Sequence, residues 1–251
     1  MSKQPHDTSP ALSLRGVTVA LRARRSVYAE SYPVLRGIDL DVFHGETLGV
    51  LGRNGAGKTT LLRVMAGVLK PDAGSVRRDA GASCQLLSLN PWLVPHLSGR
   101  QNALLSCMLN GVTSRRAKAM LPEIEKYADL GKYFDEPVSS YSSGMLVRLG
   151  FAAAIQVQPD ILLLDELLGV GDADFYEKST RSLKAQIDSD RTVVLVSHNE
   201  AALSELCHRI VWIGEGRVLA IGEPRDVLAQ YRADLHPGGT DAPVPASSGA
   251  G

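Results

Sequence analysis

Apolar and polar positions along this chain predict a fold that combines strands with helices. Residues 12–19 and 34–42 alternate partly between apolar and polar side chains, as antiparallel strands with one buried face do. The runs 47–51, 161–164 and 192–196 are apolar almost throughout. Such short runs are typical of strands in a parallel sheet that helices cover on both faces. We therefore predict an α/β fold with a mostly parallel core sheet and an N-terminal antiparallel β subdomain.

Helical segments and a late hairpin complete the pattern. The predicted helices lie at residues 60–66, 98–110, 114–130, 144–157 and 224–231. The helices at 98–110, 114–130 and 144–157 predict an inserted helical subdomain of about residues 90–158. Pro122 is expected to kink or divide one of these helices. Asp72-Ala-Gly74 predicts a turn, and residues 209–220 predict a hairpin.

Composition narrows the class of protein. The 251 residues are 44% hydrophobic, and 27 Lys and Arg balance 27 Asp and Glu, which argues against a broad nucleic-acid surface. Cys84, Cys107 and Cys207 are odd in number and widely spaced, so they predict free thiols in a reducing compartment and no zinc site.

The two ends of the chain predict no membrane anchor. Residues 1–10 lack the apolar segment of a secretory signal, and the chain has no apolar run of about 18 residues. Residues 1–10 and the Pro-, Gly-, Ala- and Ser-rich tail 236–251 are expected to be disordered around a domain at 11–235. We therefore predict a protein that is cytoplasmic by itself and reaches a membrane only through a partner.

One segment fits the phosphate-loop pattern G-x-x-x-x-G-K-[ST] at every fixed position. It follows a predicted strand and precedes a predicted helix, which disfavours the alternative of a simple glycine-rich turn. Backbone N–H groups of such a loop, with the helix amino end, hold phosphate oxygens. Lys58 is expected to reach the β- and γ-phosphates, and Thr59 to ligate Mg²⁺. The residues expected to contact the nucleotide are Gly52, Arg53, Asn54, Gly55, Ala56, Gly57, Lys58, Thr59 and Thr60.

Two other predicted strands end in residues suited to hydrolysis. The run 161–164 leads into Asp165 and Glu166, and the run 192–196 leads into His198. Ligands of parallel sheets bind beyond the carboxyl ends of strands. We expect Asp165 to hold Mg²⁺ directly or through water, Glu166 to polarise the attacking water, and His198 to contact the γ-phosphate. The alternative for Asp165 and Glu166 is that they are simply solvated acids at the end of a strand. The alternative for His198 is a surface or capping residue.

The serine-rich segment 139–145 precedes the predicted helix 144–157. Its hydroxyl and N–H groups suit a second anion site at the helix start, although an ordinary helix cap is the alternative. Its place in the chain, between the phosphate loop and Asp165, is the informative observation.

The order of these motifs resembles the nucleotide-binding subunits of ABC transporters over roughly residues 11–232. The segment 141–145, Tyr-Ser-Ser-Gly-Met, is similar to the family signature L-S-G-G-Q at its serine and second glycine, and departs from it elsewhere. Residues 167–172 resemble the loop after the catalytic glutamate. The resemblance implies a P-loop NTPase fold of the ABC ATPase type that binds ATP and Mg²⁺. Its implied further nucleotide contacts are Ser142, Ser143, Gly144 and Asp172.

Four segments resemble one branch of the family, the exporters of lipid-linked polysaccharide such as capsule, O-antigen, teichoic acid and galactan. These segments are residues 97–102, 130–135, 141–145 and 170–175. The resemblance implies an ATPase at the cytoplasmic face of the cell membrane, an integral-membrane permease as partner, and no nucleic acid. It also implies a head-to-tail homodimer, in which each ATP lies between the phosphate loop of one copy and Ser142 and Gly144 of the other.

Two features of the family are out of place. Its usual glutamine would fall near Ser88 or Leu89, and Gln85 is nearby but out of register. Its adenine-stacking aromatic would fall near Leu21. Tyr28 or Tyr32, in the basic segment 22–33, can stack on the base instead, and ordinary loop packing is the equal alternative.

Two other functions are alternatives to transport. A soluble, non-transport ABC-type ATPase that acts in DNA repair or on ribosomes usually carries long coiled coils or two nucleotide-binding halves, and this sequence has neither. A regulatory GTP-binding switch would need a guanine-reading Asn-Lys-x-Asp segment, which is also missing.

Overall fold

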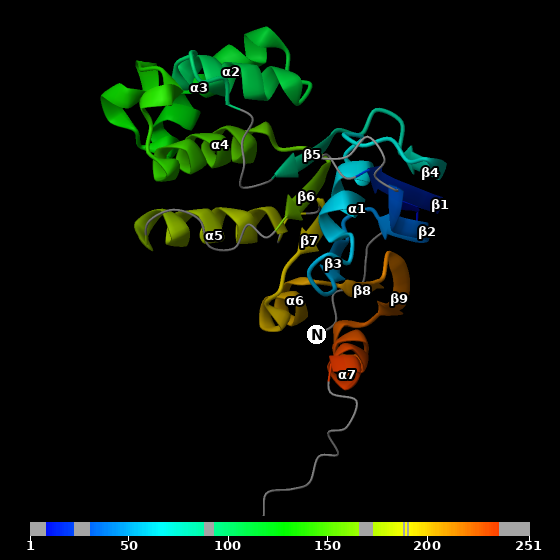
Figure 1. Cartoon of the computed structure of the whole chain (residues 1–251). Coiled ribbons are helices and arrows are strands. Elements are labelled where there is room, and N and C mark those ends of the chain that lie inside the picture. The colour runs from blue at the N-terminus through cyan, green and yellow to red at the C-terminus, as the bar shows by residue number, and fades with distance from the viewer. Residues whose placement is uncertain are drawn as a thin grey trace, which may run out of the picture.

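The computed structural model of the protein describes residues 9–22, 31–87, 93–165, 173–187, 189 and 191–235. Nearly all of the two predicted disordered ends, 1–10 and 236–251, lies outside these residues. A six-stranded sheet in the order β5-β6-β7-β3-β8-β9 runs through the centre (Figure 1). Its strands are β5 (Cys84–Leu87), β6 (Ile161–Asp165), β7 (Thr192–Val196), β3 (Thr47–Leu51), β8 (Arg209–Gly214) and β9 (Arg217–Gly222). All neighbours are parallel except β8 and β9, which confirms the predicted core sheet.

A second, three-stranded sheet in the order β2-β1-β4 is antiparallel and confirms the predicted N-terminal β subdomain. Its strands are β1 (Pro10–Arg22), β2 (Ser31–Phe43) and β4 (Ala73–Arg78). Pairing of β1 with β2 continues to Arg22 and Ser31, so part of the segment 22–33 is strand rather than insertion. The predicted turn 72–74 is wrong at Ala73 and Gly74, which lie in β4. At Gly74 a Cβ would lie 2.4 Å from the carbonyl oxygen of Gly16, so the two strands approach closely there.

Seven α-helices lie in the described ranges, and none is long and apolar enough to cross a membrane. They are α1 (Lys58–Met65), α2 (Gly99–Leu109), α3 (Ser114–Ala128), α4 (Ser143–Val157), α5 (Ala173–Ile187), α6 (Glu200–Leu206) and α7 (Pro224–Leu235). Two 3₁₀ segments, η1 (Gly131–Asp135) and η2 (Val138–Ser140), precede α4. Helix α3 is not divided at Pro122. The proline costs one helical hydrogen bond, and water can satisfy the carbonyl it leaves at the exposed Lys118.

Three clusters of buried apolar side chains hold the layers together. The first lies between the six-stranded sheet and β1, β2 and α1, and the second covers the other face of that sheet under α5, α6 and α7. The third, which we call the helical core, lies among α2, α3, α4 and η1. Figure 1 shows these green helices together, away from the blue strands β1 and β2.

Helix α4 belongs to two of these clusters. Phe151 and Ile155 pack into the second cluster, whereas Leu149 and Ala153 pack into the helical core. The second half of α4 is mostly apolar and buried, as expected where a helix lies between two packed layers. The rings of Tyr127 on α3, Phe151, and Phe175 on α5 lie 5.8–6.1 Å apart between centroids, and they join the helical core to the sheet.

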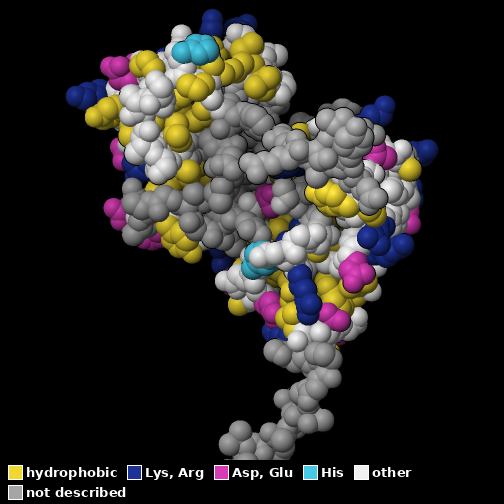
Figure 2. Space-filling model, viewed as in Figure 1, with side chains coloured by type: hydrophobic (Ala, Val, Ile, Leu, Met, Phe, Trp, Pro, Cys, Tyr) yellow, Lys and Arg dark blue, Asp and Glu magenta, His cyan; other side chains and the backbone are white. Residues whose placement is uncertain are grey.

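The surface carries mixed charge. Figure 2 shows Lys and Arg interspersed with Asp and Glu on the face that it draws, and apolar side chains gathered over the helical region. The exposed apolar side chains of that region include Met108 and Leu109 on α2, 44% and 73% exposed.

Candidate functional site

The phosphate loop joins β3 to α1 at the carboxyl edge of the six-stranded sheet. All five residues of β3 are buried, and β7 and β8 pair with it on either side, so the start of the loop is fixed. Gly55 and Gly57 have positive φ of 80° and 101°. A Cβ at Gly57 would come within 2.9 Å of the carbonyl oxygen of Val34. Glycine is therefore needed at Gly57 both for the backbone angle and for the space.

Lys58 is the first residue of α1, and its ammonium group lies within the curve of the loop. The side chain is buried, and Nζ donates to the carbonyl oxygens of Gly52 at 2.7 Å and Arg53 at 3.0 Å. The first N–H groups of α1 have no partner within the helix and carry partial positive charge. A buried cation beside a helix amino end favours an anion such as a phosphate.

Thr59 and Asp165 meet although they are 106 positions apart in the sequence. Thr59 lies in the first turn of α1, and Asp165 ends β6. The distance from Thr59 Oγ1 to Asp165 Oδ1 is 3.4 Å. Hydroxyl and carboxylate oxygens are the donors that Mg²⁺ prefers, so these two residues fit that ion. No group of three or more His, Cys, Asp or Glu in the described part of the chain could form a site of its own.

His198 lies near the same edge. Its strand β7 pairs with β6 so that Val196 lies opposite Asp165, which places His198 two residues beyond that pair. The side chain is exposed. The alternative of a capping residue is wrong, because Asn199 caps α6 with Oδ1 accepting from the Ala202 N–H at 3.1 Å.

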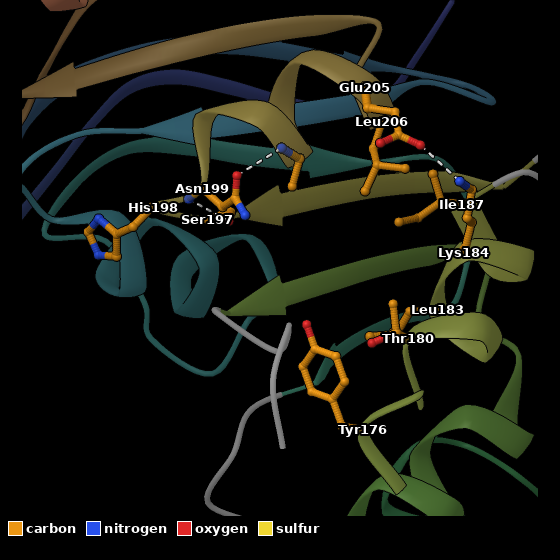
Figure 3. A pocket seen from close by; sticks show the side chains of 11 residues that line it. Tyr176, Thr180, Leu183, Lys184, Ile187, Ser197, His198, Asn199, Glu205 and Leu206 are labelled. Carbon is orange, nitrogen blue, oxygen red and sulfur yellow. Dashed lines mark hydrogen bonds and ion pairs between the residues drawn. The ribbon is translucent and has the colours of Figure 1, made fainter. Parts of the chain in front are cut away.

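A hollow of about 450 Å³ opens beside His198 between α5 and α6. Figure 3 shows His198 at one end, turned away from Tyr176 and Thr180 of α5. Lys184 and Glu205 form an ion pair of 2.8 Å across it. The hollow therefore adjoins the sheet edge that carries Asp165 and His198.

The serine-rich segment behaves as a cap and stays accessible. Ser142 is the N-cap of α4, and its Oγ accepts from the Met145 N–H at 3.3 Å. Ser142 and Ser143 are exposed, and a Cβ at Gly144 would meet nothing nearer than 3.9 Å. The capping alternative therefore holds for Ser142, and the same serine faces solvent at a helix amino end. Within this single chain the segment belongs to the helical core, whereas the phosphate loop belongs to the sheet.

Several expected residues cannot be placed. Glu166, Asp172, Tyr28, Ser88 and Leu89 lie outside the described residues. The predicted roles of Glu166 and Asp172 remain predictions.

Gln85 and Tyr32 do have places in the structure. Gln85 lies inside β5 opposite Leu162, is buried, and its Oε1 has no hydrogen-bond partner among the described residues. It therefore faces the sheet interior and not the phosphate edge. Tyr32 is 53% exposed and lies directly opposite Leu21 in the β1–β2 ladder. Opposite residues in an antiparallel ladder share a face, so Tyr32 occupies the face on which the family's aromatic was expected.

The start of α2 lies in the segment 97–102, for which the resemblance implied no contact with the site. There Ser98 and Gln101 form a capping box, a pattern that the spacing S-x-x-Q signals. Its neighbours Gly99 and Arg100 contact the segment that leads into Ser142. No spacing in the sequence indicates those contacts.

Comparison with known proteins agrees with this geometry. Residues 35–169 match the family described as ABC transporter. The teichoic acids export ATP-binding protein TagH of Enterococcus faecalis is 36% identical over 219 residues, 86% of this chain and 48% of that protein. The O-antigen export system ATP-binding protein RfbB of Klebsiella pneumoniae is 37% identical over 211 residues, 84% of this chain and 85% of that protein. The chain thus spans about half the length of the first relative.

A solved structure shares the fold. The dimeric structure of a post-hydrolysis state of the ATP-binding cassette MJ0796, bound to ADP and Pi, aligns with a TM-score of 0.69 and 23% identity, over 85% of this chain and 99% of that one. This likeness confirms the predicted ABC ATPase fold. Since the family match covers more than half of the sequence and both relatives exceed 30% identity, the chain belongs to the ABC transporter family.

Proposed function

We propose that this chain binds and hydrolyses ATP as the nucleotide-binding subunit of an ABC transporter, and that it powers export of a lipid-linked polysaccharide across the cytoplasmic membrane. One observation carries the proposal. The buried Lys58 lies in a glycine loop whose next residue, Thr59, is 3.4 Å from Asp165 at the end of a parallel strand. The names of the two relatives, a teichoic acid and an O-antigen export protein, support the class of cargo.

Hydrolysis would use residues from three strand ends. Lys58 and the loop N–H groups bind the β- and γ-phosphates and neutralise charge as the γ-phosphoryl group leaves. Thr59 and Asp165 would hold Mg²⁺, which supplies further charge neutralisation when bound. Glu166 orients a water for attack on the γ-phosphorus and accepts its proton, while His198 contacts the γ-phosphate. The bond from the γ-phosphorus to the bridging oxygen breaks, and the products are ADP and phosphate.

A second copy of the chain would complete each site. The exposed Ser142 and Ser143 and the open face of Gly144 are suited to meet a γ-phosphate that the other copy holds. Asp172 is proposed as a further contact with the nucleotide. ATP then joins the two copies, and hydrolysis removes the link, which gives the difference in affinity that a ligand-driven change requires. Tyr32, which is exposed opposite Leu21, is suited to stack on adenine.

The partner and location follow from the proposed role. An integral-membrane permease would carry the glycan, and the ATPase would bind it from the cytoplasmic side as a peripheral subunit. The helical region of α2, α3 and α4, with the exposed Met108 and Leu109, is suited to face that permease. The balanced charge of 27 basic and 27 acidic residues supports the absence of a nucleic-acid partner.

The test is Glu166→Gln, with Glu177→Gln on the exposed surface of α5 as the matched control. Loss of a positioned base lowers turnover by roughly 10²–10⁴. We expect that loss in steady-state ATP hydrolysis with Mg²⁺ and permease, retained ATP binding and a longer-lived dimer, whereas the control keeps wild-type turnover. Near-normal hydrolysis by Glu166→Gln would remove Glu166 from its role. Stimulation of the wild type by DNA or ribosomes, and not by permease, would favour a non-transport ATPase.

A further inference from the structure

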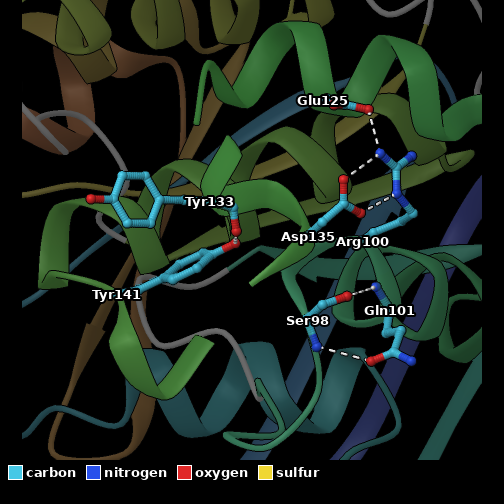
Figure 4. A network of polar contacts seen from close by, with 7 residues as sticks. All are labelled: Ser98, Arg100, Gln101, Glu125, Tyr133, Asp135 and Tyr141. Atoms are coloured by element: carbon cyan, nitrogen blue, oxygen red, sulfur yellow. Dashed lines mark hydrogen bonds and ion pairs between the residues drawn. The ribbon is translucent and has the colours of Figure 1, made fainter. Parts of the chain in front are cut away.

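Tyr141, the residue before Ser142, is buried although it departs from the family signature. Only 9% of it is exposed, and its hydroxyl donates to the carbonyl oxygen of Tyr133 at 2.5 Å (Figure 4). Burial raises the pKa of Tyr141, so the hydroxyl stays protonated and remains a donor. A leucine, which the family signature usually has here, could not make this bond.

The hydroxyl of Tyr141 fits into a notch at Gly99, the first residue of α2. A Cβ at Gly99 would lie 2.2 Å from the Tyr141 oxygen and 2.9 Å from the carbonyl oxygen of Phe134. The Gly99 N–H donates to the Glu136 carbonyl at 3.2 Å. The glycine is therefore needed here because the tyrosine hydroxyl occupies the space of its side chain.

The acceptor of this hydrogen bond is itself fixed. Tyr133 lies in η1. Arg100 of α2 binds the end of that segment, because its Nε donates a hydrogen bond to Asp135 Oδ1 at 2.6 Å. The same guanidinium donates to Glu125 Oε2 on α3 at 2.9 Å and lies 4.9 Å from the centroid of the Phe134 ring. Figure 4 shows the two sets of contacts on either side of η1. Tyr141 is thus attached to a segment that is fastened to two helices.

We infer that Tyr141 is a positioning residue of the nucleotide site, whose hydroxyl, held between the Tyr133 carbonyl and Gly99, fixes Ser142 and the first turn of α4 for contact with the nucleotide of the other copy. This inference rests on the proposed function. Ser142 is exposed, and among the described residues its side chain makes one hydrogen bond, to the Met145 N–H of its own helix. The packing of α4 holds the helix as a whole, and the buried Tyr141 adds a fixed point directly before Ser142.

Tyr141→Phe removes the hydroxyl and keeps the ring. Tyr133→Phe is the matched control, since Tyr133 contributes only its backbone carbonyl and its own side chain is 44% exposed. Hydrogen exchange of the Met145 amide reports directly on the Ser142 cap. Loss of one buried hydrogen bond corresponds to roughly a fivefold change, so we expect about fivefold faster exchange and about fivefold lower ATP turnover in Tyr141→Phe. ATP affinity at low protein concentration, where each copy binds alone, stays unchanged, and the control matches wild type in all three measurements.

Gly99→Ala tests the notch. In the wild-type background the new methyl group collides with the Tyr141 hydroxyl, whereas in the Tyr141→Phe background that oxygen is gone. We expect Gly99→Ala to lower turnover less in the second background than in the first, with the nearby Phe134 carbonyl leaving part of the cost in both. A cost that is equal in the two backgrounds would show that the hydroxyl does not act at Gly99.

The outcomes separate this inference from the proposed function. Wild-type exchange and turnover in Tyr141→Phe would overturn the inference, and so would faster exchange with unchanged turnover. A wild-type protein that hydrolyses no ATP with its permease would refute the proposed function instead. In that case the exchange of the Met145 amide still decides whether Tyr141 fixes Ser142.

Discussion

The two halves of the proposed nucleotide site are held in place by different means. The phosphate loop starts from a strand whose five residues are all buried and paired on both sides. Ser142 lies at the start of α4 in the helical core. The preceding residue, Tyr141, is fixed by its hydrogen bond to Tyr133 and by the space at Gly99. One half therefore depends on the backbone ladder of a sheet, and the other on individual side chains.

The difference shows which half can vary. Ladder hydrogen bonds join backbone groups, so the pairing of β3 does not depend on contacts between particular polar side chains. Contacts between specific side chains, such as Arg100 with Asp135, fail when either partner changes. The signature half is thus the half in which substitutions can adjust the site without disturbing phosphate binding.

The largest expected effect is on the helical core. Phe134 is fully buried there, and Phe134→Ala is expected to cost about 3–5 kcal/mol of unfolding free energy through the cavity it leaves. Urea unfolding measures it, with Tyr133→Ala as the exposed control. If the two halves are held independently, the variant keeps nucleotide binding at the phosphate loop in low urea. Loss of that binding along with the helical core would break the comparison.

Lys58→Ala tests the phosphate-loop half of the proposed nucleotide site. Removing one preorganised donor to developing charge lowers turnover by roughly 10²–10³, and we expect a loss of that size in steady-state ATP hydrolysis. Lys70→Ala, at an exposed lysine in the loop after α1, serves as the control and keeps wild-type rates. Tyr141→Phe should leave the ATP affinity of a single copy intact, whereas Lys58→Ala should reduce it. Equal affinities in the two variants would contradict a division of labour between the halves.

The smallest effect tests the opposite end of the sheet. Asp160 precedes β6 and accepts from the N–H and the hydroxyl of Ser83, which precedes β5, at 2.8 and 2.7 Å. The hydroxyl bond is the main reason why the pKa of Asp160 lies below its ordinary value of 3.8. A lowered pKa in the folded state gives stability that is present above the ordinary value and is lost as pH falls through the folded value.

Asp160→Asn should therefore destabilise the protein at pH 7 and cease to do so near pH 2. The exposed position limits the effect to about 0.5–1 kcal/mol. Urea unfolding of the variant and of Glu123→Gln at several pH values measures it. A cost that stays constant down to pH 2 would show that the carboxylate charge is not involved.

The sequence predicts the elements that have strong apolar patterns. The strands around 12–19 and 34–42, the helices at 98–110 and 144–157 and the late hairpin are confirmed. Strand β4 was not predicted, because five of its six residues are exposed and it contains Gly74 and two arginines. Strand β5 has only four residues, and α5 presents few apolar positions among charged ones.

The residues of the candidate site also fall into those that the sequence could predict and those that it could not. The rule that ligands lie beyond the carboxyl ends of parallel strands was enough to predict that Asp165 would lie beside the phosphate loop, where Thr59 meets it. The place of Gln85 was not predictable, because only the start of β5 determines that its side chain turns into the sheet. Likewise no spacing links Tyr141 to Gly99, which lies 42 residues away in the sequence, because that contact depends on how α2 and η1 pack.

Helix α4 constrains how Ser142 can move. Its apolar side chains fill both the helical core and the cluster under the sheet. Close-packed interiors resist gradual deformation, so a rotation of α4 must shift its neighbours in both clusters as a rigid body. Mechanical load applied at the signature serine therefore reaches α5 through Phe151 and Phe175, whose ring centroids are 5.8 Å apart.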